Sequence, residues 1–282
     1  MENWKQRLGF WTLRISALLV LAVLIFLLGD IILKGGSVID LEFLSTPPRQ
    51  GMTAGGIFPA IAGTFYLSLI TALVAVPLGI MGGIYLSEYA SQGKLTRLIR
   101  MSIRNLAGVP SIVFGMFGVT IFVNFFGFGL SLLSAGLTLG IMTLPVTITA
   151  SEEALKSVPD SYRQGALALG TTRWQMIRTC VLPPAVPGML TGSILGLARA
   201  AGETAPILFT GAAFLHPHLP DSPFSQFMAL PYHLYILATQ HHDISRVRPI
   251  AYGTALVLIL LVLILNIGAI ILREKLSRRY RR

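Results

Sequence analysis

The sequence has few charged residues and a single cysteine. Only 12% of its 282 residues are Asp, Glu, Lys or Arg, whereas a soluble domain carries about 25%. Hydrophobic residues make up 54% of the chain, and the mean hydropathy is +0.72. This balance excludes a soluble enzyme and a disordered regulator, because water cannot be the main solvent of so apolar a chain. Cys180 has no second cysteine to pair with, which excludes a disulfide-stapled secreted domain.

The sequence also lacks the short motifs of several enzyme classes. It contains no Gly-x-x-x-x-Gly-Lys-Ser/Thr phosphate-binding loop, so this chain is not expected to hydrolyse ATP. It has neither a Gly-x-Ser-x-Gly elbow nor a His-Glu-x-x-His site, and nothing else indicates a hydrolase. We therefore expect a non-catalytic protein with no cofactor of its own.

Long apolar segments dominate the chain instead. A helix needs about 20 mostly apolar residues to cross a bilayer. Six segments meet that length: Ile15–Leu33, Gly63–Ser87, Leu106–Phe126, Leu130–Ala150, Pro187–Phe214 and Tyr252–Leu272. The sequence therefore predicts an all-α integral membrane protein with six transmembrane helices.

The basic residues indicate how this protein is oriented in the bilayer. Most of the 22 Lys and Arg residues lie in the N-terminus, in the loops after the second and fourth spans, and in the C-terminus. With six spans these four regions share one side, and the positive-inside rule places both termini in the cytoplasm. The net charge of +10 therefore reflects membrane topology, and we expect no nucleic-acid partner.

The segments divide the chain into two predicted units. Residues 1–58 form an N-terminal anchor helix and an outer Gly/Pro-rich loop, and residues 59–282 form a core of five helices. The core carries a cytoplasmic elbow at 151–184 and an outer His-containing loop at 215–250. Within that loop, Phe224–Thr239 is apolar but too short to span, which favours a short interfacial or re-entrant helix.

Small residues recur at four-residue spacing within the core spans. The pairs Gly79/Gly83 and Gly136/Gly140 and the run from Gly188 through Gly192 and Gly196 follow this spacing. In lipid such faces let two helix backbones approach closely and gain packing contacts. We therefore expect these glycines to mark helix interfaces.

The cytoplasmic elbow is predicted to contain two short helices. Ser161–Leu169 forms the first, and Gly170 suits the left-handed cap that ends it. Thr172, with Gln175 three residues later, predicts a capping box that begins the second helix. That helix is expected to run to Val181 and to stop at Pro183-Pro184.

The elbow carries a resemblance to a known family. Gln164-Gly165-Ala166, three residues, Gly170, nine residues, then Cys180-Val181-Leu182-Pro183 resembles the "EAA" loop of type I ATP-binding cassette importer permeases. That loop reads Glu-Ala-Ala, three residues, Gly, nine residues, Ile, one residue, Leu-Pro; Gln164, Gly165 and Cys180 depart from it. The resemblance implies a coupling helix that seats on a cytoplasmic ATPase subunit. The residues it implies for coupling are Arg163, Gln164, Gly165, Ala166, Gly170, Thr172, Trp174, Leu182 and Pro183.

Three further blocks resemble the PstA-type permeases of phosphate importers. They are Ala198-Arg199-Ala200-Ala201-Gly202-Glu203-Thr204-Ala205-Pro206, the block from Gly55 to Thr64, and Pro110-Ser111-Ile112-Val113-Phe114-Gly115. The resemblance implies a type I importer bundle in the plasma (inner) membrane of a prokaryote, importing inorganic phosphate by alternating access. It also implies a second, homologous permease subunit, a dimer of ATPase subunits and an extracytoplasmic phosphate-binding protein.

Two charges inside the fifth span are the candidate anion pathway. A charge at mid-bilayer costs about 2.5 to 3.5 kcal/mol, so such residues usually face a bundle interior or a watery path. Arg199 and Glu203 are four residues apart, which permits a salt bridge. One alternative is an ion pair that only holds helices together. In the other, a guanidinium at Arg199 passes phosphate between two permease subunits, with Glu203 and Thr204 beside it.

Glu203 leads to a hypothesis about selectivity. Phosphate keeps a proton near pH 7 and can donate it in a hydrogen bond to a carboxylate. Sulfate has no proton to offer and meets only repulsion. Glu203 is therefore predicted to favour phosphate over sulfate.

The remaining alternatives concern the outer loop and the energy source. All five histidines lie in that loop: His216, His218, His233, His241 and His242. A metal site or a membrane-embedded metalloenzyme would use these histidines. However, no set of acidic residues or cysteines beyond Asp221 and Asp243 completes such a site. We therefore expect no metal, and we expect this loop to be a polar surface that docks the binding protein. A permease for molybdate or sulfate would share the elbow, and an ion-driven secondary transporter would not need it.

Overall fold

The computed structural model describes residues 4–280, and for Lys5 and residues 276–280 it describes the backbone alone. Nearly all of these residues are helical. The long helices are α1 (Trp4–Gly36), α3 (Phe58–Ile84), α4 (Lys94–Ala107), α6 (Leu132–Lys156), α9 (Leu182–Ala201) and α12 (Ile244–Tyr280). The short ones are α2 (Leu41–Ser45), α5 (Ser111–Gly118), α7 (Asp160–Ala168), α8 (Arg173–Met176), α10 (Ala205–Thr210) and α11 (Leu230–Thr239). The prediction of an all-α membrane protein is confirmed.

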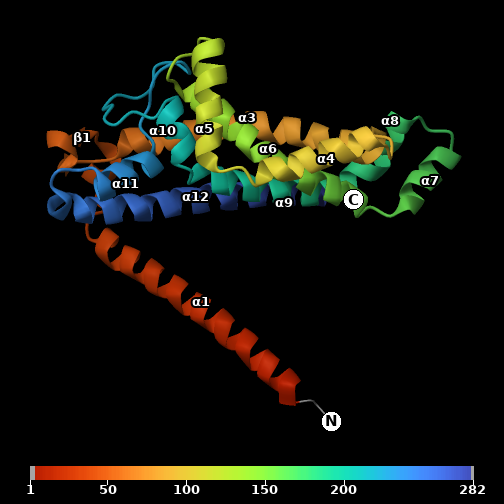
Figure 1. Cartoon of the computed structure of the whole chain (residues 1–282), viewed down its shortest axis with the longest axis horizontal. Coiled ribbons are helices and arrows are strands. Elements are labelled where there is room, and N and C mark those ends of the chain that lie inside the picture. The colour runs from red at the N-terminus through yellow and green to blue at the C-terminus, as the bar shows by residue number, and fades with distance from the viewer. Residues whose placement is uncertain (1–3, 281–282) are drawn as a thin grey trace.

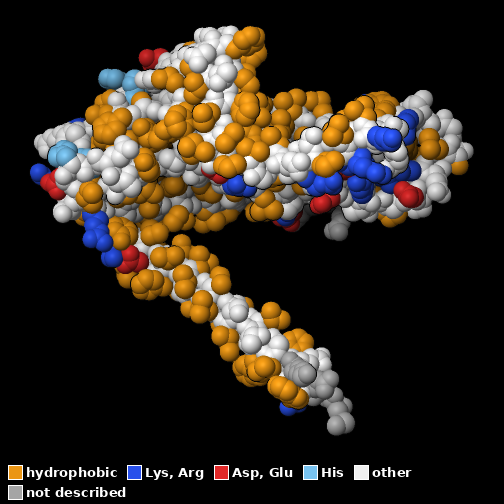
Figure 2. All heavy atoms as spheres, in the orientation of Figure 1, with side chains coloured by type: hydrophobic (Ala, Val, Ile, Leu, Met, Phe, Trp, Pro, Cys, Tyr) orange, Lys and Arg blue, Asp and Glu red, His pale blue; other side chains and the backbone are white. Residues whose placement is uncertain are grey.

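Four helices form the body of the molecule. Helices α3, α6, α9 and α12 run side by side along its long axis (Figure 1). The elbow of α7 and α8 lies at one end, and α11 lies at the opposite end, which we call the far end. Basic side chains gather toward the elbow end, whereas hydrophobic side chains cover much of the rest of the visible face (Figure 2).

Glycine seams bring these helices into close contact. A Cβ placed on Gly79 of α3 would collide with the side chain of Thr147 on α6. A Cβ placed on Gly192 of α9 would collide with the side chain of Ala150, also on α6. Only a residue without a side chain allows backbones to approach this closely. The prediction that the spaced glycines mark helix interfaces is confirmed at these positions, and α6 is the helix that both neighbours pack against.

Two of the six predicted spans differ from the helices of the structure. Within residues 4–280, five helices are long and apolar enough to cross a membrane, or six if one bent pair counts as a single span. The bent pair joins α4 to α5 and its π-helical continuation η3 (Val119–Phe125) at an angle of 103°. The predicted span Leu106–Phe126 is therefore bent, because Val109 precedes Pro110 and this position disfavours helical backbone.

The predicted fifth span is also interrupted. Helix α9 begins at Leu182, earlier than the expected Pro187, and ends at Ala201. Gly202 then caps the helix, and only the six residues of α10 follow before the chain becomes irregular. The expected helix from Pro187 to Phe214 is therefore wrong beyond Ala201, and the break falls at the two charges of this span.

The far end is closed by short elements that pack on α11 and α12. Strands β1 (Pro48–Arg49) and β2 (Ala54–Gly55) pair antiparallel around the turn η1 (Gln50–Met52). Met52 has a positive φ of 71° and its side chain is buried against Ile236 and Val247. The short helix expected over Phe224–Thr239 is present only from Leu230 onward, since Pro231 suits the first turn of a helix.

Helix α1 contacts the body of the molecule near one of its ends only. A Cβ on Gly35 would lie 2.6 Å from the backbone oxygen of Tyr252 on α12, so the two helices touch there. From that point α1 diverges from the bundle (Figure 1), and its apolar side chains from Ile15 to Leu27 are exposed. A helix that is apolar on all sides is suited to lipid or to another membrane helix.

A buried histidine at the far end makes stability there depend on pH. His233 of α11 is buried, its Nδ1 has no hydrogen-bond partner among the described residues, and burial lowers its pKa from 6.5 to about 4. The unfolded segment therefore binds a proton more readily between these values, and stability is present above pH 6.5 and lost as the pH falls toward 4. A shift of this size corresponds to roughly 3 kcal/mol.

We expect the protection of the α11 amides, which is their exchange rate relative to that of an unfolded chain at the same pH, to be lower at pH 5 than at pH 7, and His233→Phe to remove most of that difference. His218→Phe, which alters an exposed histidine of the same loop, is the matched control and should leave the difference unchanged. Equal protection at both pH values in the wild type would contradict the prediction.

Candidate transport site and coupling elbow

The elbow folds from the local signals in its sequence. Helix α7 ends at Ala168, and Gly170 adopts a φ of +77°, as expected for a left-handed cap. The Thr172 hydroxyl accepts a hydrogen bond from the Gln175 amide at 3.3 Å, and the Gln175 side chain accepts one from the Thr172 amide at 2.8 Å. The predicted capping box is confirmed.

The predicted stop at Pro183-Pro184 is wrong. The chain stays helical through both prolines, by way of the π-helical turn η4 (Ile177–Val181) and straight into α9. The wider turn places the prolines in the first turn of α9, where a missing N–H costs nothing. Leu182 and Pro183 are therefore half-buried at the start of a helix that leads into the bundle.

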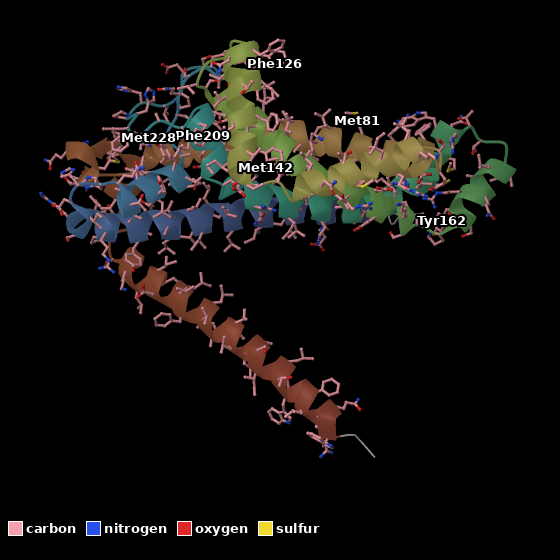
Figure 3. All side chains as sticks on the ribbon, in the orientation of Figure 1. Met81, Phe126, Met142, Tyr162, Phe209 and Met228 are labelled. Atoms are coloured by element: carbon pink, nitrogen blue, oxygen red, sulfur yellow. The ribbon has the colours of Figure 1, made fainter. Side chains whose placement is uncertain are left out.

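One face of the elbow is packed and the other is open. Ala166, Ile177 and Val181 are buried with Leu155 of α6 in a small apolar core. On the open face Gln164 and Gly165 are exposed, and Leu169 has 85% of its surface exposed. Trp174 is also exposed, and Tyr162 lies at the edge of the elbow (Figure 3). An exposed patch that contains Trp, Tyr and Leu is typical of a protein-docking surface.

An ion pair anchors this elbow to η2 (Tyr85–Tyr89), the π-helical turn that continues α3. The Arg163 guanidinium donates two hydrogen bonds to the Glu88 carboxylate, at 2.8 and 3.2 Å, and only 4% of the Glu88 side chain is exposed. Arg163 also donates to the carbonyl oxygens of Leu155 and Val158. The hydrogen bonds that Arg163 donates to the Glu88 carboxylate raise the pKa of Arg163 above its usual range.

A second buried carboxylate supports the same end of the bundle. Glu152 of α6 accepts hydrogen bonds from Arg100 of α4 at 2.8 Å and from Lys156 at 2.6 Å. Arg100 also donates to the carbonyl oxygen of Leu86. The sequence gives no signal for Glu88 or Glu152, because an acidic residue near the end of a span resembles any surface residue until its partner is known. Glu88 and its partner are 75 residues apart, and Glu152 and Arg100 are 52 residues apart.

The two charges of the fifth span meet where α9 ends. Arg199 Nε lies 3.5 Å from Glu203 Oε1, so the expected pairing is present. The Arg199 side chain is 65% exposed on this chain, and the Glu203 side chain is 18% exposed. Thr204 directly follows and is the N-cap residue of α10. Gly192 and Gly196 of the same helix are buried, so the arginine reaches out of the seam in which these glycines lie.

Arg199 lines a narrow groove under the bend between α4 and α5. The groove has a volume of only about 20 Å³ in this chain alone, and its wall includes Ser111 of α5, Thr143 of α6 and Gly196. Met142, from the same wall, lies near the middle of the bundle (Figure 3). The arginine is therefore near mid-depth, where a membrane would be least able to solvate it.

One helix connects the two predicted sites. Leu182 and Pro183 begin α9 at the elbow, and Arg199 lies in its last turn. Seventeen residues of helix separate Leu182 from Arg199, which corresponds to about 25 Å. Helix α9 is therefore a continuous connection between the elbow and the break where Arg199 and Glu203 lie.

The histidines of the far end do not gather into one cluster. His241 and His242 are stacked with ring centroids 4.4 Å apart, and His216 and His218 are 6.2 Å apart. The His241 ring accepts a hydrogen bond from the Asp243 amide and so donates from Nε2 to the Gly51 carbonyl at 2.8 Å. Within the described residues no group of three or more His, Cys, Asp or Glu side chains is arranged to hold a metal ion.

This chain is similar in sequence to several transport proteins over most of its length. The family described as "Binding-protein-dependent transport system inner membrane component" matches residues 75–282. The probable ABC transporter permease protein YqgI of Bacillus subtilis is 35% identical over 266 residues, which is 90% of each chain. The phosphate transport system permease protein PstA of Yersinia pestis is 35% identical over 277 residues, 96% of this chain and 90% of that protein. PstA 1 of Mycobacterium tuberculosis H37Rv is 35% identical over 94% of this chain and 86% of its own length.

Solved structures of bacterial importers share the fold. A transporter that imports the acidic polysaccharide alginate aligns over 99% of both chains, with a TM-score of 0.65 and 16% identity. An inward-facing form of the methionine transporter MetNI aligns over 80% of this chain and 95% of that one, with a TM-score of 0.59 and 18% identity. The chain therefore belongs to the family of binding-protein-dependent transport system inner membrane components and has the fold of a type I ABC importer permease.

Proposed function

We propose that this chain is the membrane-spanning permease subunit of an ATP-driven importer of inorganic phosphate. The observation that carries the proposal is Arg199, an arginine placed near mid-depth of an apolar bundle at the break in α9. The relatives named as phosphate permeases, similar over most of this chain, support phosphate as the anion. Residues 1–58 serve as an anchor and residues 59–282 as the core that moves.

Arg199 offers the chemistry that a phosphate needs in an apolar place. A guanidinium forms two parallel hydrogen bonds with a phosphate, which fixes its orientation as well as its charge. Glu203, 3.5 Å away, neutralises the arginine while no anion is bound. The Thr204 hydroxyl is a further donor beside it. Because the carboxylate competes with the anion for the same guanidinium, phosphate binds weakly enough to leave again.

A second, homologous permease subunit completes this pathway. Arg199 is 65% exposed on the isolated chain, and lipid in contact with it would impose the cost of an unsolvated charge. The groove beside it is also open on one side. A partner chain that covers this face removes the arginine from lipid and encloses the passage between the two subunits.

The open face of the elbow docks an ATPase subunit. Its exposed residues combine Leu169 and Trp174 with the uncharged Gln164 and Gly165, and they stand at the end of the bundle where basic side chains gather (Figure 2). Each permease subunit engages one copy of an ATPase dimer, and closure of the dimer moves the elbow. The polar far end docks an extracytoplasmic phosphate-binding protein.

The orientation follows from the same distribution of charge. Arg173 of α8 and Arg178 of η4 belong to the elbow itself, and Lys94 and Arg97 lie at the start of α4. Basic side chains gather toward this end (Figure 2), which is therefore cytoplasmic. The side chains of Lys5 and of Arg278 to Arg282 lie outside the described residues, so the internal loops carry the assignment. Both termini are proposed to be cytoplasmic, in the inner membrane of a prokaryote.

The test is transport by the complete complex in liposomes. We expect ATP-dependent uptake of labelled phosphate, little competition by sulfate or molybdate, and co-purification of an ATPase subunit. Glu203→Gln should reduce the preference for phosphate over sulfate. Preferred uptake of another oxyanion, or uptake without ATP, would refute the phosphate importer. Unchanged selectivity in Glu203→Gln would refute only the role of Glu203 and assign selectivity to the binding protein.

A further inference from the structure

A groove unrelated to the transport site lies at the far end, where α1 meets the bundle. It has a volume of about 400 Å³ and is bounded by α1, α11 and α12. Its walls are largely apolar and include Ile31 of α1, Leu237 and Ala238 of α11, and Ala255 of α12. Ser245, Arg248 and Tyr252 are the polar residues of its lining. A space of this size falls in the range of small-molecule sites.

The polar rim of this groove carries an uncompensated positive charge. Lys34 is paired with Asp30 at 2.6 Å and lies over the Tyr252 ring at 5.0 Å. Arg248 is exposed, and within the described part of the chain no hydrogen bond or salt bridge engages its guanidinium, although its charge reaches Asp30. Figure 2 shows basic side chains beside one acidic side chain where α1 joins the bundle. The charges of Lys34 and Asp30 neutralise each other, and the positive charge of Arg248 remains.

The groove lies at the depth of a lipid headgroup. Lys34 follows the apolar run of α1, and Arg248 precedes the apolar run of α12, so both stand where these two helices leave the hydrocarbon. Tyr252 is an aromatic residue with a polar tip, of the kind that gathers at membrane interfaces. On the hydrocarbon side of this rim the apolar lining continues with Ile31 of α1 and with Ala251 and Ala255 of α12.

We propose that this groove binds a phospholipid with an anionic headgroup. Arg248 and the Ser245 hydroxyl hold the lipid phosphate, and one acyl chain lies between α1 and α12 against Ile31 and Ala255. A guanidinium with no protein partner matches a phosphodiester, and the apolar walls match the chain below it. Free inorganic phosphate shares the headgroup chemistry, but it would gain nothing from apolar walls.

A bound lipid would also connect α1 to the rest of the molecule. Contact between α1 and α12 is close at Gly35 and Tyr252, and the helices then separate. A lipid at this junction fills the beginning of the gap and packs on three helices at once. The site is therefore structural, and the proposal does not depend on which anion the protein transports.

The experiment compares lipid retention by the purified complex in detergent, measured by native mass spectrometry. The probes are phosphatidylglycerol, which is anionic, and phosphatidylcholine, which carries no net charge. Arg248→Gln should weaken retention of phosphatidylglycerol about tenfold, because one charge-assisted interaction is lost. Arg246→Gln, which alters an exposed arginine outside the groove lining, is the matched control and should retain the lipid as the wild type does.

A second variant tests the apolar part of the same site. Ala238→Trp fills the groove from an exposed position on α11 and should lower retention of both lipids while the complex remains assembled. Unchanged retention in Arg248→Gln would overturn the proposal. So would displacement of the lipid by inorganic phosphate, which identifies a free-anion site, or a photocrosslink from residue 238 to a protein subunit in place of lipid.

Discussion

Arg199→Ala should lower ATP-dependent phosphate uptake by at least about a hundredfold while the complex still assembles. A charged hydrogen bond contributes about 1.5 to 3 kcal/mol, and a bidentate contact loses two of them, which corresponds to a factor of 10² or more. The pair with Glu203 has a separation of 3.5 Å, longer than a charge-assisted hydrogen bond, so its loss should disturb folding little. The measurement is initial uptake by reconstituted liposomes, beside the yield of the complex.

Two further variants separate transport from structure at this site. Arg199→Lys keeps the charge but loses the planar fork, and should retain a small part of the activity. Glu203→Ala removes the partner without removing the guanidinium. If Arg199 only holds helices together, Arg199→Ala and Glu203→Ala should lower thermal stability equally and leave uptake normal, and that result would contradict the pathway role.

Arg163→Ala should uncouple ATP hydrolysis from transport. The substitution leaves Glu88 buried, with 4% of its side chain exposed and without its bidentate partner. Removing one member of a buried pair costs roughly 3 to 5 kcal/mol, and in this protein the carbonyl oxygens of Leu155 and Val158 lose a donor as well. Helix α7 then loosens from α3, so movement of the elbow no longer displaces α9. We expect ATPase activity that responds weakly to phosphate, and uptake reduced at least tenfold.

The controls for this variant come from the same elbow. Arg178→Ala removes an exposed basic residue of η4 and should preserve both activities. Glu88→Gln, which keeps the shape and removes the charge, should give an intermediate loss. Hydrogen exchange in α7 reports the loosening independently of function. Full coupling in Arg163→Ala, with unchanged exchange in α7, would show that the pair does not carry the movement.

The sequence by itself determined the features that depend on short stretches of chain. Apolar runs identify the spans because lipid requires each segment to satisfy its own backbone. Gly170 and the Thr172–Gln175 box determine the ends of the elbow helices. The four-residue spacing of Gly79 with Gly83, and of Gly192 with Gly188 and Gly196, predicts the faces by which α3 and α9 contact α6. Each of these signals acts within about one or two turns of helix.

Only the tertiary structure decided how distant segments meet. Pro110 marks a boundary, but packing against α6 and α10 sets the 103° bend, and the helix break after Ala201 likewise exposes Arg199 to the groove below that bend. The Glu88–Arg163 pair joins residues 75 apart, and three separate helices make the groove at Arg248. Local propensity cannot specify such contacts, because their energies arise from surfaces that exist only after the helices have packed together.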